Sequence, residues 1–116
     1  MLLLVGIAGL FGVVARYLIS SPFHGDALPW VTIGINVAGS LVLGILVSSH
    51  TFSQDFRTVA GVGFLGGFTT FSTFSVQGFL DIEAGEPIRA LIYVAASVIL
   101  GLAAAACGYY FGRAAF

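Results

Sequence analysis

The chain has 116 residues, of which 59% are apolar and 8% carry a charge. Soluble domains carry about 25% charged residues, so this composition excludes a water-soluble globular protein and indicates that lipid surrounds most of the chain. A net charge of -1, with arginine and no lysine as the strong cation, excludes the basic surface that nucleic-acid binding requires.

Four apolar segments follow one another along the chain, at residues 2–19, 30–49, 58–80 and 88–111. A helix needs about 20 apolar residues to cross a membrane, and each segment is close to or above that length. Barrel strands are about ten residues long and alternate in polarity, which these continuous runs do not. The sequence therefore predicts an all-α membrane protein, a single transmembrane domain over residues 1–116 with four helices joined by polar loops.

The first two segments carry few polar side chains. Segment 2–19 lacks the positive n-region of a signal peptide and is interpreted as a retained span. Arg16, near its end, is expected either to anchor at the interface or to attract anions into a vestibule. Asn36 is the strongest polar residue of segment 30–49. Its amide is expected either to bridge two helices or to donate to an anion.

The third segment is the most informative part of the chain. Gly66-Gly67 is predicted to break the helix in mid-membrane, either as a simple kink or as a site where freed backbone carbonyls bind a cation. After this break, Phe68, Phe71 and Phe74 recur at every third position, which places them near one helical stripe. Five hydroxyl side chains accompany these rings: Thr69, Thr70, Ser72, Thr73 and Ser75.

The hydroxyls and rings together predict a polar track for an anion. Serine and threonine in membrane helices often bond to carbonyls of their own helix, but five of them beside a break indicate a path. Because the track contains no carboxylate, it is a poor path for cations. Hydroxyl protons and the positive edges of phenylalanine rings can replace the water around a small hard anion without trapping it.

The arginines predict how the chain inserts. With four spans, both termini lie on one side, which receives Arg57 and Arg113, whereas the other side receives Arg16 and Arg89. Because the bias of lysine and arginine sets orientation, this balance predicts insertion in both directions unless another factor decides it. Two oppositely inserted copies can then form an antiparallel homodimer around a two-fold axis in the membrane plane.

Nothing in the sequence predicts catalysis. His24 and His50 lie in loops without the cysteine or acid spacing of a metal site, and no catalytic triad or nucleotide-binding motif is present.

Three motifs resemble those of the Fluc family of fluoride channels, also called CrcB proteins, over essentially the whole chain. They are Gly12-x-x-x-Arg16-Tyr17, Gly34-x-Asn36-x-x-Gly39-Ser40 and Gly66-Gly67-x-Thr69-Thr70-Phe71-Ser72-Thr73-Phe74. The resemblance implies an antiparallel, dual-topology homodimer with two fluoride pores. It implies pore roles for a set of residues in the second and third segments: Phe71, Phe74, Asn36, Ser72, Thr73 and Ser75. It places Arg16 near the entrance, and it implies that the backbone carbonyls of Gly66 and Thr69 from both subunits hold a structural Na⁺ at the dimer interface. It also implies polar groups in the last segment, where Tyr93 and Ser97 are the candidates in a stretch otherwise rich in alanine.

The sequence therefore favours a passive fluoride channel, multi-pass in the cytoplasmic (inner) membrane of a microbe, that lowers the toxicity of fluoride by exporting it. A proton-coupled small multidrug transporter has the same size and number of spans, but it needs an intramembrane carboxylate. All the acids fall in loops or at span ends: Asp26, Asp55, Asp81, Glu83 and Glu86. A scaffold subunit without transport activity would not explain the polar track.

Overall fold

The computed structural model describes all residues, 1–116, and contains helices and no strand. Four helical stretches are long and apolar enough to cross a membrane, judged by length and composition: Leu2–Ser20, Gly25–Ser48, Gln54–Glu83 and Pro87–Ala115. The prediction of an all-α protein with four membrane-spanning helices is confirmed. The helical elements are α1 (Leu2–Ser20), η1 (Gly25–Ala27), α2 (Leu28–Ser48), α3 (Gln54–Arg57), η2 (Thr58–Leu65), α4 (Gly66–Phe68), α5 (Phe71–Glu83) and α6 (Pro87–Ala115).

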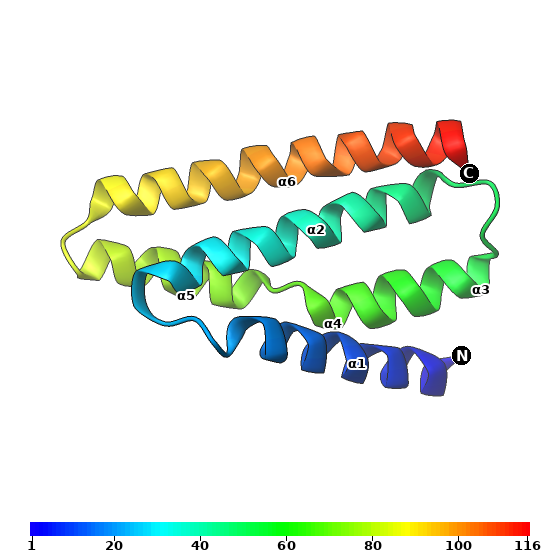
Figure 1. Ribbon diagram of the computed structural model, residues 1–116, viewed down its shortest axis with the longest axis horizontal. Helices are drawn as coiled ribbons and strands as arrows, with labels where there is room; N and C mark the ends of the chain where they lie inside the picture. Colours follow the sequence, from blue (N-terminus) through cyan, green and yellow to red (C-terminus); the bar gives the residue numbers. More distant parts are fainter.

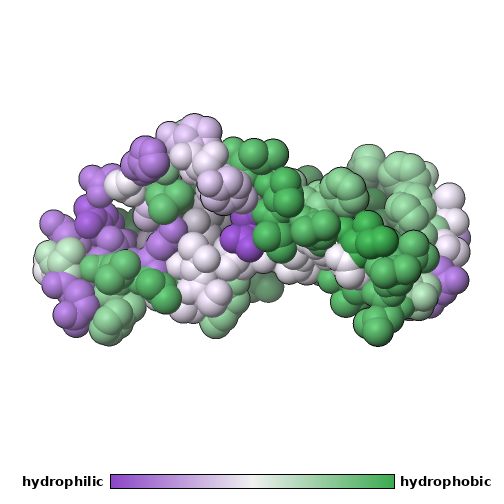
Figure 2. Space-filling model, turned by 90° about the horizontal axis from the view of Figure 1, so that it is seen from below, coloured by the Kyte–Doolittle hydropathy of each residue, from purple (hydrophilic) through white to green (hydrophobic).

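The four spans run side by side along the long axis of the molecule, and both termini lie at the same end (Figure 1). That axis is 48 Å long, close to the full thickness of a bilayer with its headgroups, about 40–45 Å. Polar side chains gather toward the two ends, most densely at the end with the α5–α6 connection (Figure 2). This distribution fits a molecule whose middle lies in hydrocarbon.

The chain alone has little interior. Only 17 of its 116 residues are buried, and large apolar side chains are exposed along every span. In water such exposure would drive aggregation. In a membrane, lipid or a second protein chain covers these side chains, so the fold of one chain is consistent with a larger assembly.

Glycines set the closest helix contacts. α1 packs on the third span so tightly that a Cβ at Gly12 would collide with the Phe64 carbonyl oxygen, and one at Gly67 would lie 2.5 Å from the Gly9 carbonyl oxygen. α2 and α6 meet in the same way, since a Cβ at Gly108 would collide with the Leu41 carbonyl oxygen. Small residues allow this close approach of backbones, which is typical of helix pairs in membranes.

The third span consists of four helical elements, α3, η2, α4 and α5, and breaks after Phe68. The π-helix η2 leads into the short α4, and the backbone then becomes extended at Thr69 (φ -87°, ψ 159°) and Thr70 (φ -149°, ψ 119°). The prediction of a break in this span is confirmed, but its predicted position at Gly66-Gly67 is wrong. Both glycines stay helical because Gly67 packs directly on the backbone of α1.

The end of the third span also differs from the prediction. Asp81 was expected in the loop after the third segment, but α5 continues to Glu83 and Asp81 is a buried helical residue. Its carboxylate accepts a hydrogen bond from Arg89 of α6, with 3.1 Å between Arg89 Nε and Asp81 Oδ1. This ion pair lets the acid stay inside the helix near the membrane surface. The final helix is also longer than predicted and ends at Ala115.

Candidate functional site

An open groove of about 360 Å³ lies where the third span breaks. α2, the broken span and α6 form its walls, and no charged side chain lines it. The lining residues are Asn36, Gly39, Ser40, Leu43, Gly61, Leu65, Gly66, Thr69, Thr70, Phe71, Phe74, Ser97, Val98 and Gly101. The groove therefore brings together Asn36, Phe71 and Phe74, three of the predicted pore residues, which come from two different spans.

Asn36 clamps the backbone of the break. Its Nδ2 donates to the Thr70 carbonyl oxygen at 3.0 Å, and the Thr70 N–H donates to Asn36 Oδ1 at 2.9 Å. An amide has two N–H groups and an acceptor oxygen, so one N–H of Asn36 remains for another partner. The expectation that Asn36 bridges two helices is confirmed, and its position in the groove leaves that N–H available to a ligand.

Thr70 begins α5 as its N-cap. Its Oγ1 accepts from the Thr73 N–H at 3.2 Å and donates to Thr73 Oγ1 at 3.0 Å. A side-chain oxygen at this position satisfies one of the unpaired N–H groups of a helix start. The cap explains why the helix resumes immediately after two extended residues.

The other hydroxyls of the predicted track divide into two groups. Thr69 Oγ1 donates to the Leu65 carbonyl at 2.9 Å and Ser75 Oγ donates to the Phe71 carbonyl at 3.0 Å, both within their own span. These bonds are the backbone pairing common in membrane helices. Ser72 is exposed and Thr73 half-buried. Neither these two residues nor Ser75 lines the groove, so in one chain they lie beside it.

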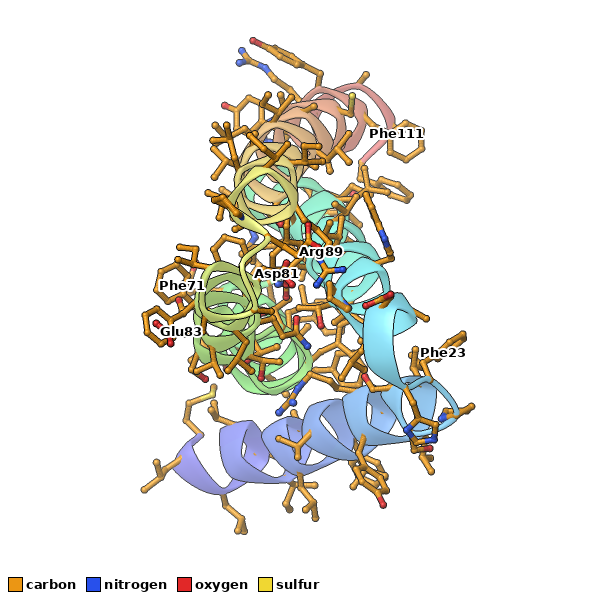
Figure 3. All side chains as sticks on the ribbon, turned by 90° about the vertical axis from the view of Figure 1, so that its left-hand side faces the viewer. Phe23, Phe71, Asp81, Glu83, Arg89 and Phe111 are labelled. Atoms are coloured by element: carbon orange, nitrogen blue, oxygen red, sulfur yellow. The ribbon has the colours of Figure 1, made fainter.

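The two predicted pore rings sit at the start of α5. The Phe71 and Phe74 ring centroids are 5.7 Å apart with planes tilted by 47°. Phe71 is 79% exposed, and Figure 3 shows it pointing away from the other helices. Phe74 turns inward and packs on Tyr93 of α6, with 5.2 Å between ring centroids. Phe68 does not continue this stripe, because it lies before the break and stacks on Phe64.

Arg16 reaches the third span from α1, just before the break, whereas Asn36 reaches it from α2, just after. Its Nε donates to the Gly67 carbonyl oxygen at 3.3 Å, and the residue is half-buried. Arg16 thus turns inward from α1 toward the third span, a contact that neither of its predicted roles, interfacial anchor or vestibule charge, required. The helix that ends at Phe68 directs the negative end of its dipole at this point, so a guanidinium is electrostatically favourable there.

The carbonyls of Gly66 and Thr69 lack the backbone partners that a continuous helix would give them, because the Thr70 and Thr73 N–H groups donate to side chains. Since the Thr70 N–H donates to Asn36, it does not pair with the Gly66 carbonyl, which a continuous helix would require. Thr69 is extended, and both residues border the groove. Carbonyls released from a broken membrane helix, at the negative end of its dipole, are the ligands that coordinate Na⁺ in membrane transporters.

Several polar contacts near the groove were not predicted from sequence. Tyr93 was only a candidate, and the structure joins its hydroxyl to Gln77 Oε1 of α5 at 2.8 Å. One turn further toward the membrane surface lies the ion pair of Asp81 and Arg89. The sequence feature that could have predicted these contacts is a four-residue spacing. Gln77 and Asp81 share one face of their helix, and Arg89 and Tyr93 share one face of theirs.

With this geometry known, the sequence was compared with known proteins. Residues 3–109 match the family described as CrcB-like protein, Camphor Resistance (CrcB). The chain belongs to the CrcB family. Among its CrcB relatives is a protein of Caulobacter vibrioides, 41% identical over 99% of this chain and 97% of the relative, named fluoride-specific ion channel FluC. Relatives in Rhizobium etli (40% identical, 97% of this chain and 95% of the relative) and Sphingopyxis alaskensis (40% identical, 90% and 88%) carry the same name. These relatives are ion channels by name, and the chain belongs to a family of channels and not of enzymes.

Proposed function

We propose that this CrcB protein is a fluoride-selective channel that works as an antiparallel homodimer with two pores. The observation that carries the proposal is the groove at the broken span, which joins Asn36, Phe71 and Phe74 without any carboxylate. The amide N–H and ring edges of these residues are donors that suit an anion, and a coupled transporter of the small multidrug type would need an intramembrane acid. The named function of relatives that match nearly the full chain supports fluoride as the anion.

The open groove favours a second copy of the chain as its cover. Phe71 is 79% exposed at the groove's edge, and four spans are too few to shield a polar path from lipid. An oppositely inserted copy would bring a second break and a second Phe71 to the same interface. In this arrangement Ser72, Thr73 and Ser75, which lie beside the groove of one chain, would extend the donor-lined path. Arg16, which binds the break, would add positive potential near the entrance.

Fluoride would move through this path by exchanging water for weak donors. The free N–H of Asn36, hydroxyl protons and ring edges each carry partial positive charge. None of them is a fixed charge that would hold the ion too tightly for conduction. A narrow path of this kind discriminates against chloride because the larger anion does not fit among the donors.

The assembly would also hold a structural sodium ion. The released carbonyls of Gly66 and Thr69, supplied by both chains, would be its ligands. Its charge would stabilise the meeting of two helix C-terminal ends at the dimer centre. In each chain Asn36 binds the backbone of Thr70 and Arg16 binds the carbonyl oxygen of Gly67, so these two side chains hold the broken segment in position.

Passive export follows from the membrane potential. In the cytoplasmic membrane a negative interior favours the exit of an anion by about 2.3 kcal/mol per charge for each 100 mV. The channel would therefore lower cytoplasmic fluoride, and with it fluoride toxicity, without ATP or a coupled ion.

The test is fluoride release from liposomes that contain only this purified chain, followed with a fluoride electrode and compared with chloride. We expect fast, fluoride-selective release that needs no proton gradient. Release that requires a proton gradient would favour a coupled transporter of the small multidrug type. No release from folded protein would reject the proposal that this chain alone forms the channel. It would favour a scaffold role or a need for a second chain type.

Two substitutions in the same assay test the ring edges. Phe71→Ile and Phe74→Ile keep apolar bulk and remove the aromatic edge, so both are expected to slow fluoride release strongly. Undiminished release in both variants would reject a role for the rings in conduction.

A further inference from the structure

A line of polar side chains leads from the groove to the membrane surface. We name it the polar seam, and it consists of Gln77 and Asp81 of α5 and Arg89 and Tyr93 of α6. Tyr93 packs on Phe74 at the groove, its hydroxyl bonds to Gln77, and one turn further Asp81 pairs with Arg89. In Figure 3 the Asp81 and Arg89 side chains turn toward each other between α5, α6 and α2.

The ion pair at the surface end of the seam is asymmetric. The Asp81 side chain is 12% exposed and the Arg89 side chain 46% exposed. Arg89 Nη1 also lies 3.5 Å from Asp26 Oδ1, but that carboxylate is 90% exposed and largely screened by water. A guanidinium has five N–H donors, so after these two contacts Arg89 keeps donors that face water at the end of the seam.

Stability alone is a weak explanation for this pair. Removing charges from water is costly, and a buried ion pair often contributes no more than apolar residues of the same size. A short α5–α6 connection already joins the two helices, because α5 ends at Glu83 and α6 begins at Pro87. A cation beside the proposed anion path, compensated by nearly buried Asp81 and by exposed Asp26, acts on the anion electrostatically.

We propose that Arg89 and Asp81 form the charged mouth of the fluoride path, in which Arg89 attracts the anion and Asp81 limits how strongly. The inference rests on the proposed function, since it concerns the same small anion. A full positive charge at the mouth would raise the local concentration of fluoride, and a neighbouring carboxylate reduces that field. The pair therefore sets the rate at which fluoride enters or leaves without itself forming the selective part of the path.

The proposal predicts opposite effects for the two single substitutions. Asp81→Asn leaves Arg89 with only the solvent-exposed carboxylate of Asp26 and is expected to raise the fluoride conductance several-fold in planar bilayers at low ionic strength. Arg89→Gln leaves Asp81 uncompensated and is expected to lower it several-fold. Both differences should shrink when an impermeant salt is added to about 1 M, where the Debye length falls to about 3 Å.

The double substitution Asp81→Asn/Arg89→Gln separates electrostatics from packing. It removes both charges and keeps the shapes, so its conductance should return toward that of the unsubstituted channel. If the pair only fastens α5 to α6, both single variants and the double variant will all lose conductance or dimer, which would overturn the proposal.

Glu83→Gln is the matched control. It removes the same charge from the same end of α5, but Glu83 is exposed and lies on the outer face of the helix (Figure 3). Its effect should be much smaller than that of Asp81→Asn, and an equal effect would reject a specific mouth. If the unsubstituted protein conducts and the variants do not differ from it, the mouth is rejected alone, whereas a protein that conducts no fluoride rejects both proposals.

Discussion

Asn36 and Arg16 show how single side chains make a broken helix tolerable inside a membrane. Lipid offers no hydrogen bonds, so backbone groups freed by a break must find partners in the protein. Asn36 satisfies the N–H and the carbonyl of Thr70, and Arg16 satisfies the carbonyl of Gly67. Both residues therefore stabilise the break, at the same place where the proposed pore requires hydrogen-bond donors.

Asn36→Leu tests the clamp. The substitution leaves the Thr70 N–H and carbonyl without partners in a half-buried site, which costs about 1–3 kcal/mol. We expect the purified protein to unfold at lower temperature and its fluoride release to fall. Ser40→Ala is the control, because Ser40 lies one turn further along α2 and borders the same groove. A melting temperature equal for Asn36→Leu and Ser40→Ala would contradict the clamp.

At the scale of the helices, glycine decides how α1 meets the third span. The added Cβ of a Gly12→Ala variant would collide with the Phe64 carbonyl oxygen and lie 2.9 Å from the Phe68 nitrogen. Backbone atoms cannot move aside as a side-chain end can. α1 must therefore shift away, and with it Arg16, which sits one turn later and binds Gly67.

The expected result for Gly12→Ala is a loss of about 1–3 kcal/mol of stability, as for other overpacked contacts, together with slower fluoride release. Gly6→Ala tests the same change in the same helix where no atom lies within 4 Å of the new Cβ. Alanine favours helix over glycine there by up to about 1 kcal/mol, so this variant should be at least as stable as the unsubstituted protein. Equal thermal unfolding of the two variants would show that the close contact is unimportant.

The same contacts explain what the sequence could and could not predict about these elements. Hydropathy and length are local properties, and they placed four spans within a few residues of their observed positions. The site of the break is not local. Gly66-Gly67 is the weakest helix sequence, yet packing on Gly9 keeps it helical, and the chain opens at Thr69-Thr70 where Asn36 can replace the lost bonds. Asp81 similarly joins α5 because Arg89 lies 3.1 Å away, across a turn.

For the candidate site, the sequence likewise predicted which residues gather but not how each side chain is bonded. Residue types beside the break predicted Asn36, Phe71 and Phe74, and the structure gathers all three at one groove. The bonding of each hydroxyl depends on which carbonyl lies within reach, so the sequence could not separate Ser75, which donates to the Phe71 carbonyl, from Ser72. In the proposed homodimer the path also depends on residues of a second chain, which the sequence of one chain does not place.

Acids and arginines are distributed differently between the two ends of the molecule. Most acids lie at the end that carries the α5–α6 connection, namely Asp26, Asp81, Glu83 and Glu86, whereas Asp55 lies at the end with the termini (Figure 1). The arginines remain divided two and two between the ends. Acids contribute little to orientation, so the arginine balance still predicts both insertions. In an antiparallel pair, the acidic end of each chain would lie on the same side as the less acidic end of its partner.

The two histidines offer a matched test of this topology. His24 lies in the α1–α2 connection and His50 in the α2–α3 connection, on opposite sides of the membrane, and both are exposed. His24→Arg adds a cation to the side away from the termini, and His50→Arg adds one to the side with the termini, so the two variants should bias insertion in opposite directions.

Each variant expressed alone would then lack oppositely oriented partners and release little fluoride, whereas co-expression of both should restore release because each supplies the orientation that the other lacks. The measurement is fluoride efflux from membranes of cells that express one variant or both, with cysteine labelling on each side to read orientation. Full release by each variant alone, with labelling that shows a single orientation, would contradict the antiparallel homodimer.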